Sequence, residues 1–242
     1  MRNSKNTKIT INLETIFIQA LPNSPALTNI VESLSKQVDT IIKEELNLKQ
    51  SNEFKFFLPK TIQKLTLYSL NNLNNDNTNI ITSSLEHIPI NKFVANDISI
   101  KPEVEFFGGQ FGENDELVVI INDPNEELSL YNQLIKTAMH KANSEYQKTH
   151  GNNLYDVTKS EHYSYVPHIG LGRVRTSSIK SQMKDPSQFG IVFERIQSRI
   201  KNIALDSIKN ELNTHNEKLI FDKIGIFNPG KQSWIKEYNI KG

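Results

Sequence analysis

The chain has 242 residues, and 28 Lys and Arg against 27 Asp and Glu give it a formal net charge of +1. This length allows one large domain or two small lobes, and the balanced charge excludes a protein that holds nucleic acid by bulk attraction, although a local basic site remains possible. The absence of cysteine excludes disulfides, thiol catalysis and thiolate metal sites, and it favours the cytoplasm as the compartment. No stretch reaches the roughly 18 apolar residues that span a membrane, and residues 1–8 are expected to form a loose tail.

The first half of the chain is predicted to contain a strand, a long helix and a second strand. Residues 9–21 alternate in the manner of a strand and end at Pro22 and Pro25. Residues 26–46 place their apolar side chains at helical spacing. Residues 64–70 (KLTLYSL) again alternate, and the asparagine-rich run 71–79 is expected to be a solvated loop.

The second half repeats this order. Residues 88–109 indicate one or two strands that close on a turn at Gly108 and Gly109, and residues 117–121 (LVVII) indicate a short strand buried on both faces. The remaining predictions are a helix over 126–148, a strand over 163–174, a helix over 189–212 and a closing strand over 219–227.

Strand, long helix and strand thus occur twice at nearly the same spacing. One interpretation is an internal duplication, in which two pseudo-equivalent lobes face a shared cleft. The other is two ordinary αβ crossovers in one sheet. The spacing alone does not separate them.

The second strand of each unit carries the residues that could perform chemistry. Lys64 and Thr66 share one face of the first, and His168 and Gly170 share one face of the other, because side chains alternate along a strand. Leu65 and Ile169 between them point the opposite way, toward packing.

These two strands, QKLTLYSL and VPHIGLGRV, resemble the signature strands of the 2H phosphoesterase superfamily, which includes the bacterial 2′-5′ RNA ligase-like proteins. The similarity extends over the opening strand ending in ALP, the paired strands around FFGGQF, the strand LVVII with its helix, and the basic and aromatic tail FNPGKQSWIKEY. It implies an α+β fold in which residues 9–242 form one domain of two pseudo-symmetric αβ lobes, with mostly antiparallel sheets around a central cleft.

The family places His-x-Thr or His-x-Ser in each lobe, and this resemblance implies a role for each matching residue. One imidazole takes a proton from the attacking group and the other protonates the leaving oxygen, while the hydroxyls hydrogen-bond the phosphate; no metal or cofactor is required. This chain departs twice, because Lys64 stands at the first His and Gly170 at the second hydroxyl. A lysine is protonated at neutral pH unless burial lowers its pKa, so binding phosphate suits it better than acting as a base.

Other residues are weaker candidates. Arg173 has the opposite strand parity to His168 and reaches a substrate only if the strand ends or bulges before it. Tyr165 and Trp234 could stack on a base, although aromatic side chains more often pack in the core or at its rim. Outside the family pattern, Lys64 would be an exposed strand lysine, Thr66 an ordinary strand residue and His168 a structural histidine.

The sequence therefore leads to two main hypotheses. The first is a phosphodiesterase acting on a 2′,3′-cyclic or 2′-5′-linked nucleotide or RNA end, with His168 as general acid or base and Lys64 and Thr66 on the phosphate. The second is a catalytically inactive member that binds a nucleotide, RNA or protein; an accidental match is a third possibility. A membrane and long duplex DNA are not expected partners, because the cations gather locally in residues 55–66 and 168–180 and the acids in residues 97–127.

Overall fold

The computed structural model describes residues 13–50, 53–89, 97–108, 114–160, 164–214 and 218–240. The predicted tail over residues 1–8 lies outside these ranges, as does Gly109 of the predicted turn. Among the described residues, no helix is both long enough and apolar enough to span a membrane.

The first half contains the predicted strand, helix and strand. The α1 helix begins behind Ser24, whose hydroxyl accepts a hydrogen bond from the Leu27 amide at 3.2 Å, and Pro25 occupies its first turn. The elements in chain order are β1 (Leu13–Asn23), α1 (Pro25–Glu45), β2 (Phe57–Pro59), β3 (Leu65–Asn74) and α2 (Thr78–Glu86).

The second half also follows the predicted order. The strand predicted at 117–121 is buried on both faces, since Leu117, Val118 and Val119 are all fully buried. The elements are β4 (Ser99–Gly108), β5 (Asn114–Asn122), α3 (Glu127–His150), α4 (Val157–Ser160), β6 (His168–Arg175), α5 (Thr176–Gln182), α6 (Phe189–Thr214), β7 (Ile220–Asn228) and β8 (Ser233–Asn239).

The prediction of a loop over residues 71–79 is wrong. β3 continues through Asn74, a short 3-10 turn covers Asn75–Asn77, and α2 starts at Thr78. The strand persists because Leu70, Asn71 and Leu73 are buried on it. Asparagine is a poor strand former, so at these positions packing against the rest of the sheet outweighs local propensity.

Within the described residues the strands form one eight-stranded sheet in the order β4-β5-β6-β3-β1-β7-β8, with β2 paired to β6. Every pairing is antiparallel. The α+β class with two lobes is therefore confirmed, and the two lobes share one continuous sheet. Within each repeated unit the strands, β1 with β3 and β5 with β6, are antiparallel neighbours, so neither unit is a parallel αβ crossover.

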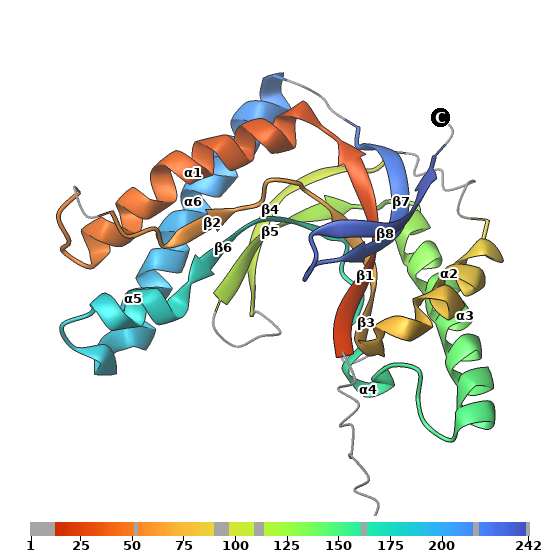
Figure 1. Cartoon of the computed structure of the whole chain (residues 1–242). Helices are drawn as coiled ribbons and strands as arrows, with labels where there is room; N and C mark the ends of the chain where they lie inside the picture. The colour runs from red at the N-terminus through yellow and green to blue at the C-terminus, as the bar shows by residue number, and fades with distance from the viewer. Residues whose placement is uncertain are drawn as a thin grey trace, which may run out of the picture.

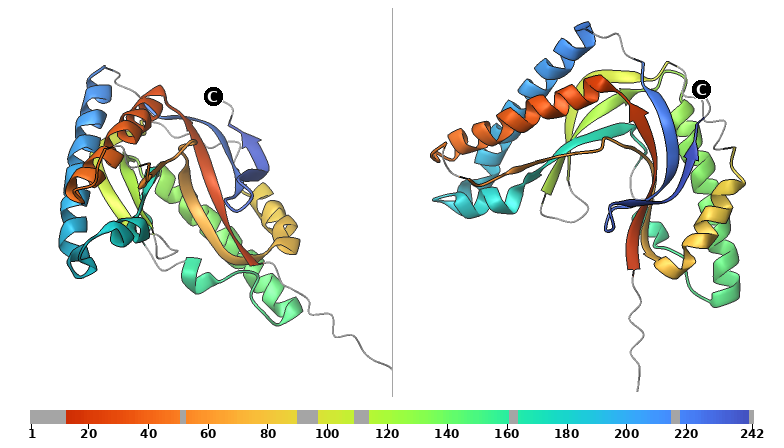
Figure 2. Two further views of the ribbon diagram at one scale, coloured as in Figure 1. Left: turned by 60° about the vertical axis from the view of Figure 1, so that its left-hand side comes forward. Right: turned by 45° about the horizontal axis from the view of Figure 1, so that its top comes forward.

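Helices α1 and α3 each cover the half of the sheet to which the strand before them does not belong. α1 follows β1 but packs beside α6 against β2 and β6, whereas α3 follows β5 but packs with α2 against β3 (Figure 1). The sheet bends between the two halves into an arch (Figure 2). This exchange ties the lobes together through the buried core as well as through the sheet.

β2 passes so close to β6 that one position admits only glycine. A Cβ built on Gly172 would overlap the ring of Phe57, which is buried. The same segment is anchored from the other side, because the Asp39 carboxylate accepts hydrogen bonds from the amides of Phe56 and Phe57 at 2.8 and 2.9 Å. These contacts fix the start of the loop that leads from β2 to β3.

Candidate functional site

The two motif strands meet at the junction between the lobes. Leu65 of β3 pairs with Ile169 of β6 in antiparallel register, and both side chains are fully buried. Residues on either side of this pair face the opposite side of the sheet. The register places Thr66 nearest His168, and Lys64 nearest Gly170.

One cleft of about 1120 Å³ lies over this junction. Six of the seven candidate residues that the sequence singled out line it, and Trp234 does not: Lys64, Thr66, Tyr165, His168, Gly170 and Arg173. The structure thus brings these six together, although the role of each residue stays a prediction. By comparison with the pattern that the sequence resembles, we call Thr66 and His168 the retained end of the cleft, and Lys64 and Gly170 the altered end.

His168 is held in one tautomer. Its Nδ1 lies 2.7 Å from the Val166 carbonyl oxygen, and because a carbonyl only accepts, Nδ1 carries the proton and Nε2 keeps the lone pair. The ring of Phe107 packs against the imidazole edge to face at 4.6 Å between centroids. Burial lowers the pKa of His168, partly opposed by the bond to Val166. The histidine is therefore neutral at pH 7 and offers a basic nitrogen.

Thr66 is held by a neighbouring strand. Gln19 of β1 donates a hydrogen bond from Nε2 to the Thr66 hydroxyl oxygen at 2.9 Å. That leaves the hydroxyl proton of Thr66 available to another acceptor. Gln19 also lines the cleft, and its buried Oε1 has no hydrogen-bond partner among the described residues.

Lys64 lies in an aromatic and basic environment. Its ammonium nitrogen is 2.8 Å from the centroid of the Phe227 ring and 5.3 Å from that of Trp234. Burial, followed by repulsion from Lys60, lowers the pKa of Lys64 to about 8. Lys64 is still mainly cationic at pH 7, but it becomes a neutral amine in mildly alkaline solution.

The space beside Gly170 is filled by a carboxylate. A Cβ built on Gly170 would overlap Oε1 of Glu116, which comes from β5. Glu116 is in turn paired with Lys60 at 3.0 Å and with Arg173 at 3.6 Å. The place of the second hydroxyl is thus taken by an acid between two cations.

Arg173 lines the cleft because the β6 strand is irregular just before it, which is the condition that its strand parity set. The pairing of β6 with β5 shifts between Gly170, opposite Val118, and Gly172, opposite Leu117. This extra residue reverses the alternation beyond it, so Arg173 faces the same side as His168.

Tyr165 lines the cleft but also packs against the core. Its hydroxyl is buried without a hydrogen-bond partner among the described residues, and burial followed by the charge of Asp123 raises its pKa. The ring of Trp234 packs edge to face on the ring of Phe227, with 5.4 Å between the centroids, so this side chain takes part in aromatic packing. Neither observation tests base stacking.

Sequence reasoning missed several cleft residues. Gln19 carries no motif, Phe107 and Phe227 were counted only within the segments FFGGQF and FNPGKQSWIKEY, and Glu116 only in an acid-rich stretch. Lys60 had a weak signal, because it lies in the acid-free segment before the first motif. The polar face of α3 that also lines the cleft shows the i, i+3, i+4, i+7 spacing of one helix side: Ser129, Asn132, Gln133 and Lys136.

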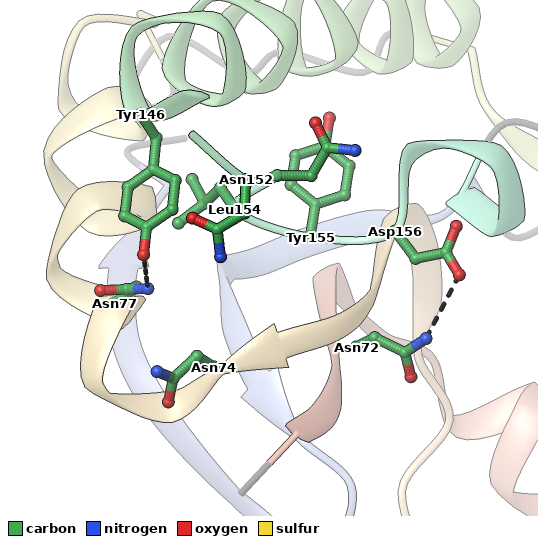
Figure 3. A pocket seen from close by; sticks show the side chains of 9 residues that line it. Asn72, Asn74, Asn77, Tyr146, Asn152, Leu154, Tyr155 and Asp156 are labelled. Atoms are coloured by element: carbon green, nitrogen blue, oxygen red, sulfur yellow. Dashed lines mark hydrogen bonds between the residues drawn. The ribbon is translucent and has the colours of Figure 1, made fainter. Parts of the chain in front are cut away.

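A second hollow of about 420 Å³ lies at the far end of β3 (Figure 3). Its lining is mostly asparagine, and four of these side chains are engaged. Asn72 donates to Asp156 at 3.2 Å and Asn77 to the Tyr146 hydroxyl at 3.1 Å, while Asn74 accepts from the Asp76 amide and Asn153 from Asn143, both at 3.3 Å. None of the described residues that line it is a cation. It therefore lacks the charge that an anionic ligand needs, in contrast to the cleft.

The described residues contain no group of three or more His, Asp or Glu able to hold a metal ion.

Comparison with solved structures places the fold. The chain is similar to Usb1 of Kluyveromyces marxianus, with a TM-score of 0.54 and 9% identity over 96% of this chain and 100% of that one. A structure of the same yeast protein with uridine monophosphate gives a TM-score of 0.53 and 9% identity, over 95% and 99% of the two chains. No protein-family model matches the chain. No curated protein matches it either. The likeness extends over nearly the full length of both proteins and shows that they share a fold.

Proposed function

We propose that the cleft binds a phosphodiester of a nucleotide or RNA end, and that the protein hydrolyses a 2′,3′-cyclic or 2′-5′ linkage. The observation that carries this proposal is the pairing of Leu65 with Ile169, which sets the two motif strands edge to edge in one cleft. The full-length likeness to a protein solved with uridine monophosphate, which is a phosphomonoester, supports a nucleotide as the ligand.

In the proposed reaction His168 is the general acid or base. Its Nε2 takes a proton from the attacking water or hydroxyl, because Nδ1 is already committed to Val166. Thr66 donates its hydroxyl proton to a phosphate oxygen, since its oxygen accepts from Gln19. Lys64, with a pKa of about 8, is still mainly protonated at pH 7 and holds the phosphate as a cation. The proton that His168 takes up then returns to the leaving oxygen.

A second candidate is binding without turnover. The altered end favours it, because Gly170 offers no donor and Glu116 occupies the place of one. A missing hydrogen bond to a charged group is worth roughly 1.5–3 kcal/mol, which at the transition state lowers the rate by about ten- to a hundredfold.

The deciding experiment measures turnover of a panel of 2′,3′-cyclic nucleotides and 2′-5′ dinucleotides by the wild type and by His168→Ala. His150→Ala is the matched control, because His150 is an exposed histidine at the end of α3 that stacks on Tyr146 and does not line the cleft. We expect activity in the wild type and the control, unchanged by EDTA, and a loss of at least a hundredfold in His168→Ala. Equal rates in all three proteins would sink the catalytic proposal, whereas binding of the same ligands without turnover would establish the second candidate.

A further inference from the structure

Glu116 is an acid in a cleft that we propose to bind phosphate, where a negative charge would repel the ligand. It is the only Asp or Glu among the described residues that line the cleft. Its side chain is 25% exposed, so it is partly withdrawn from water. It enters the space that opens because residue 170 has no side chain.

The carboxylate is held by the cations that a phosphate would seek. Lys60 contacts Oε1 at 3.0 Å and Arg173 lies 3.6 Å from Oε2, while Lys64 is close enough to Lys60 for the two charges to repel. Because His168 is neutral at pH 7, three cations and one carboxylate set the charge of this end. Glu116 therefore offsets part of the positive field without abolishing it.

We propose that Glu116 sets the charge selectivity of the cleft, disfavouring dianionic phosphomonoesters and so favouring monoanionic phosphodiesters. This inference rests on the proposed function and specifies which phosphate class the same site takes. A phosphomonoester carries close to two negative charges above its second pKa near 6, whereas a diester carries one. The Glu116 carboxylate repels the second negative charge of a bound monoester at short range. Lys60 and Arg173 cannot fully neutralise both the carboxylate and the dianion.

The expected size follows from Coulomb's law. A unit-charge interaction at about 4 Å changes an equilibrium by roughly fivefold in water and by several hundredfold at the dielectric typical of a protein surface. Since Glu116 is partly exposed, we expect a value near the lower end, about tenfold, for the change in preference when its charge is removed.

The test uses two ligands that differ by one charge: uridine 5′-monophosphate and its methyl ester, titrated calorimetrically at pH 7.5. In Glu116→Gln the affinity for the monophosphate should rise about tenfold more than that for the ester. Gly170→Ala should shift the preference in the same direction, because its Cβ displaces the carboxylate without removing it. Glu105→Gln is the matched control, since Glu105 on β4 is paired with Lys201 and does not line the cleft.

The outcomes separate this inference from the proposed function. If both ligands bind and their affinity ratio agrees within twofold between the wild type, Glu116→Gln and Gly170→Ala, Glu116 does not set selectivity and the proposed phosphate cleft stands. If neither ligand binds any of the proteins at millimolar concentration, the proposed function fails and the inference fails with it. If the affinity ratio of the two ligands shifts as much in Glu105→Gln as in Glu116→Gln, the shift comes from the net charge of the protein, and the inference is overturned as well.

Discussion

The two ends of the cleft lie on the same pair of strands, β3 and β6, and differ in chemistry. At the retained end, Thr66 faces His168, and each is positioned by one neutral hydrogen bond, from Gln19 and to Val166 respectively. At the altered end, Lys64 and Gly170 are surrounded by Lys60, Arg173 and Glu116. One end therefore suits proton transfer and the other suits charge recognition. A site built on two paired strands can divide these tasks, because one end carries an imidazole and the other carries an amine.

Alanine substitutions at the two ends should separate these tasks most strongly. We expect His168→Ala to lower kcat by roughly 10²–10⁴ with little change in KM, because a general acid or base acts in the transition state. Lys64→Ala should mainly raise KM, since it removes a cation that binds the ground state as well. Steady-state kinetics on the best cyclic nucleotide measures both. If the two variants show the same split between kcat and KM, the ends do not differ in the way described.

Rebuilding the altered end should make the two ends alike, provided that Glu116 is removed. Lys64→His with Gly170→Ser gives the two strands a His-x-Thr and a His-x-Ser, but the new side chain at 170 collides with the Glu116 carboxylate. Adding Glu116→Ala should therefore raise kcat at least tenfold above the double variant, because it frees the serine hydroxyl to donate to the phosphate. Equal rates for the double and triple variants would show that Glu116 does not block the second position.

The glycines of β6 offer a comparison in stability instead of activity. Gly172→Ala forces a methyl group into the buried Phe57 ring, which cannot retreat, and should lower the free energy of unfolding by about 1–3 kcal/mol. Gly170→Ala meets the movable end of a glutamate and should lower it by less than about 1 kcal/mol. Urea denaturation of both variants measures the difference, and a larger loss for Gly170→Ala would contradict this account of the packing.

The sequence predicts most of this fold, and the exceptions have physical causes. The long helices, the apolar strand at 117–121 and the two motif strands follow from periodicity, which tertiary packing reinforces. β2 has only three residues and β8 is a mostly exposed edge, so neither shows a hydrophobic pattern. The asparagine run misleads because burial overrides propensity at Asn71 and Leu73.

The site is predictable where it follows strand parity and unpredictable where it depends on partners from other strands. Lys64, Thr66, His168 and Gly170 follow from alternation together with the family pattern. Arg173 enters through a bulge that no residue type announces. Glu116 lies in an acid-rich segment, and only the register of β5 beside β6 shows that it faces the cations of two other segments.

The pH dependence of binding should report the altered end alone. With its pKa at about 8, Lys64 loses its charge through mildly alkaline pH, so affinity for the methyl ester of uridine 5′-monophosphate should fall several-fold between pH 7 and 9.5. Lys64→Arg should flatten this fall, because a guanidinium stays protonated. Lys64 should also make folding stability rise between about pH 8 and 10.5, since the unfolded chain then binds more protons than the folded one. A profile unchanged by Lys64→Arg would assign the fall to another group.

The smallest effect is expected at the Thr66 hydroxyl, and it tests whether the retained end binds phosphate at all. Thr66→Val keeps the β-branched shape but removes the donor, so affinity for the same methyl ester should fall about three- to tenfold. This is less than the full worth of a hydrogen bond to a charged group, because water in the open cleft can replace the donor. The substitution also leaves the Gln19 amide without the acceptor it now has, which should lower folding stability slightly. Thr66→Ser keeps the hydroxyl and separates these effects, because it should restore affinity. If Thr66→Val binds as tightly as the wild type while Lys64→Ala binds weakly, phosphate recognition belongs to the altered end only.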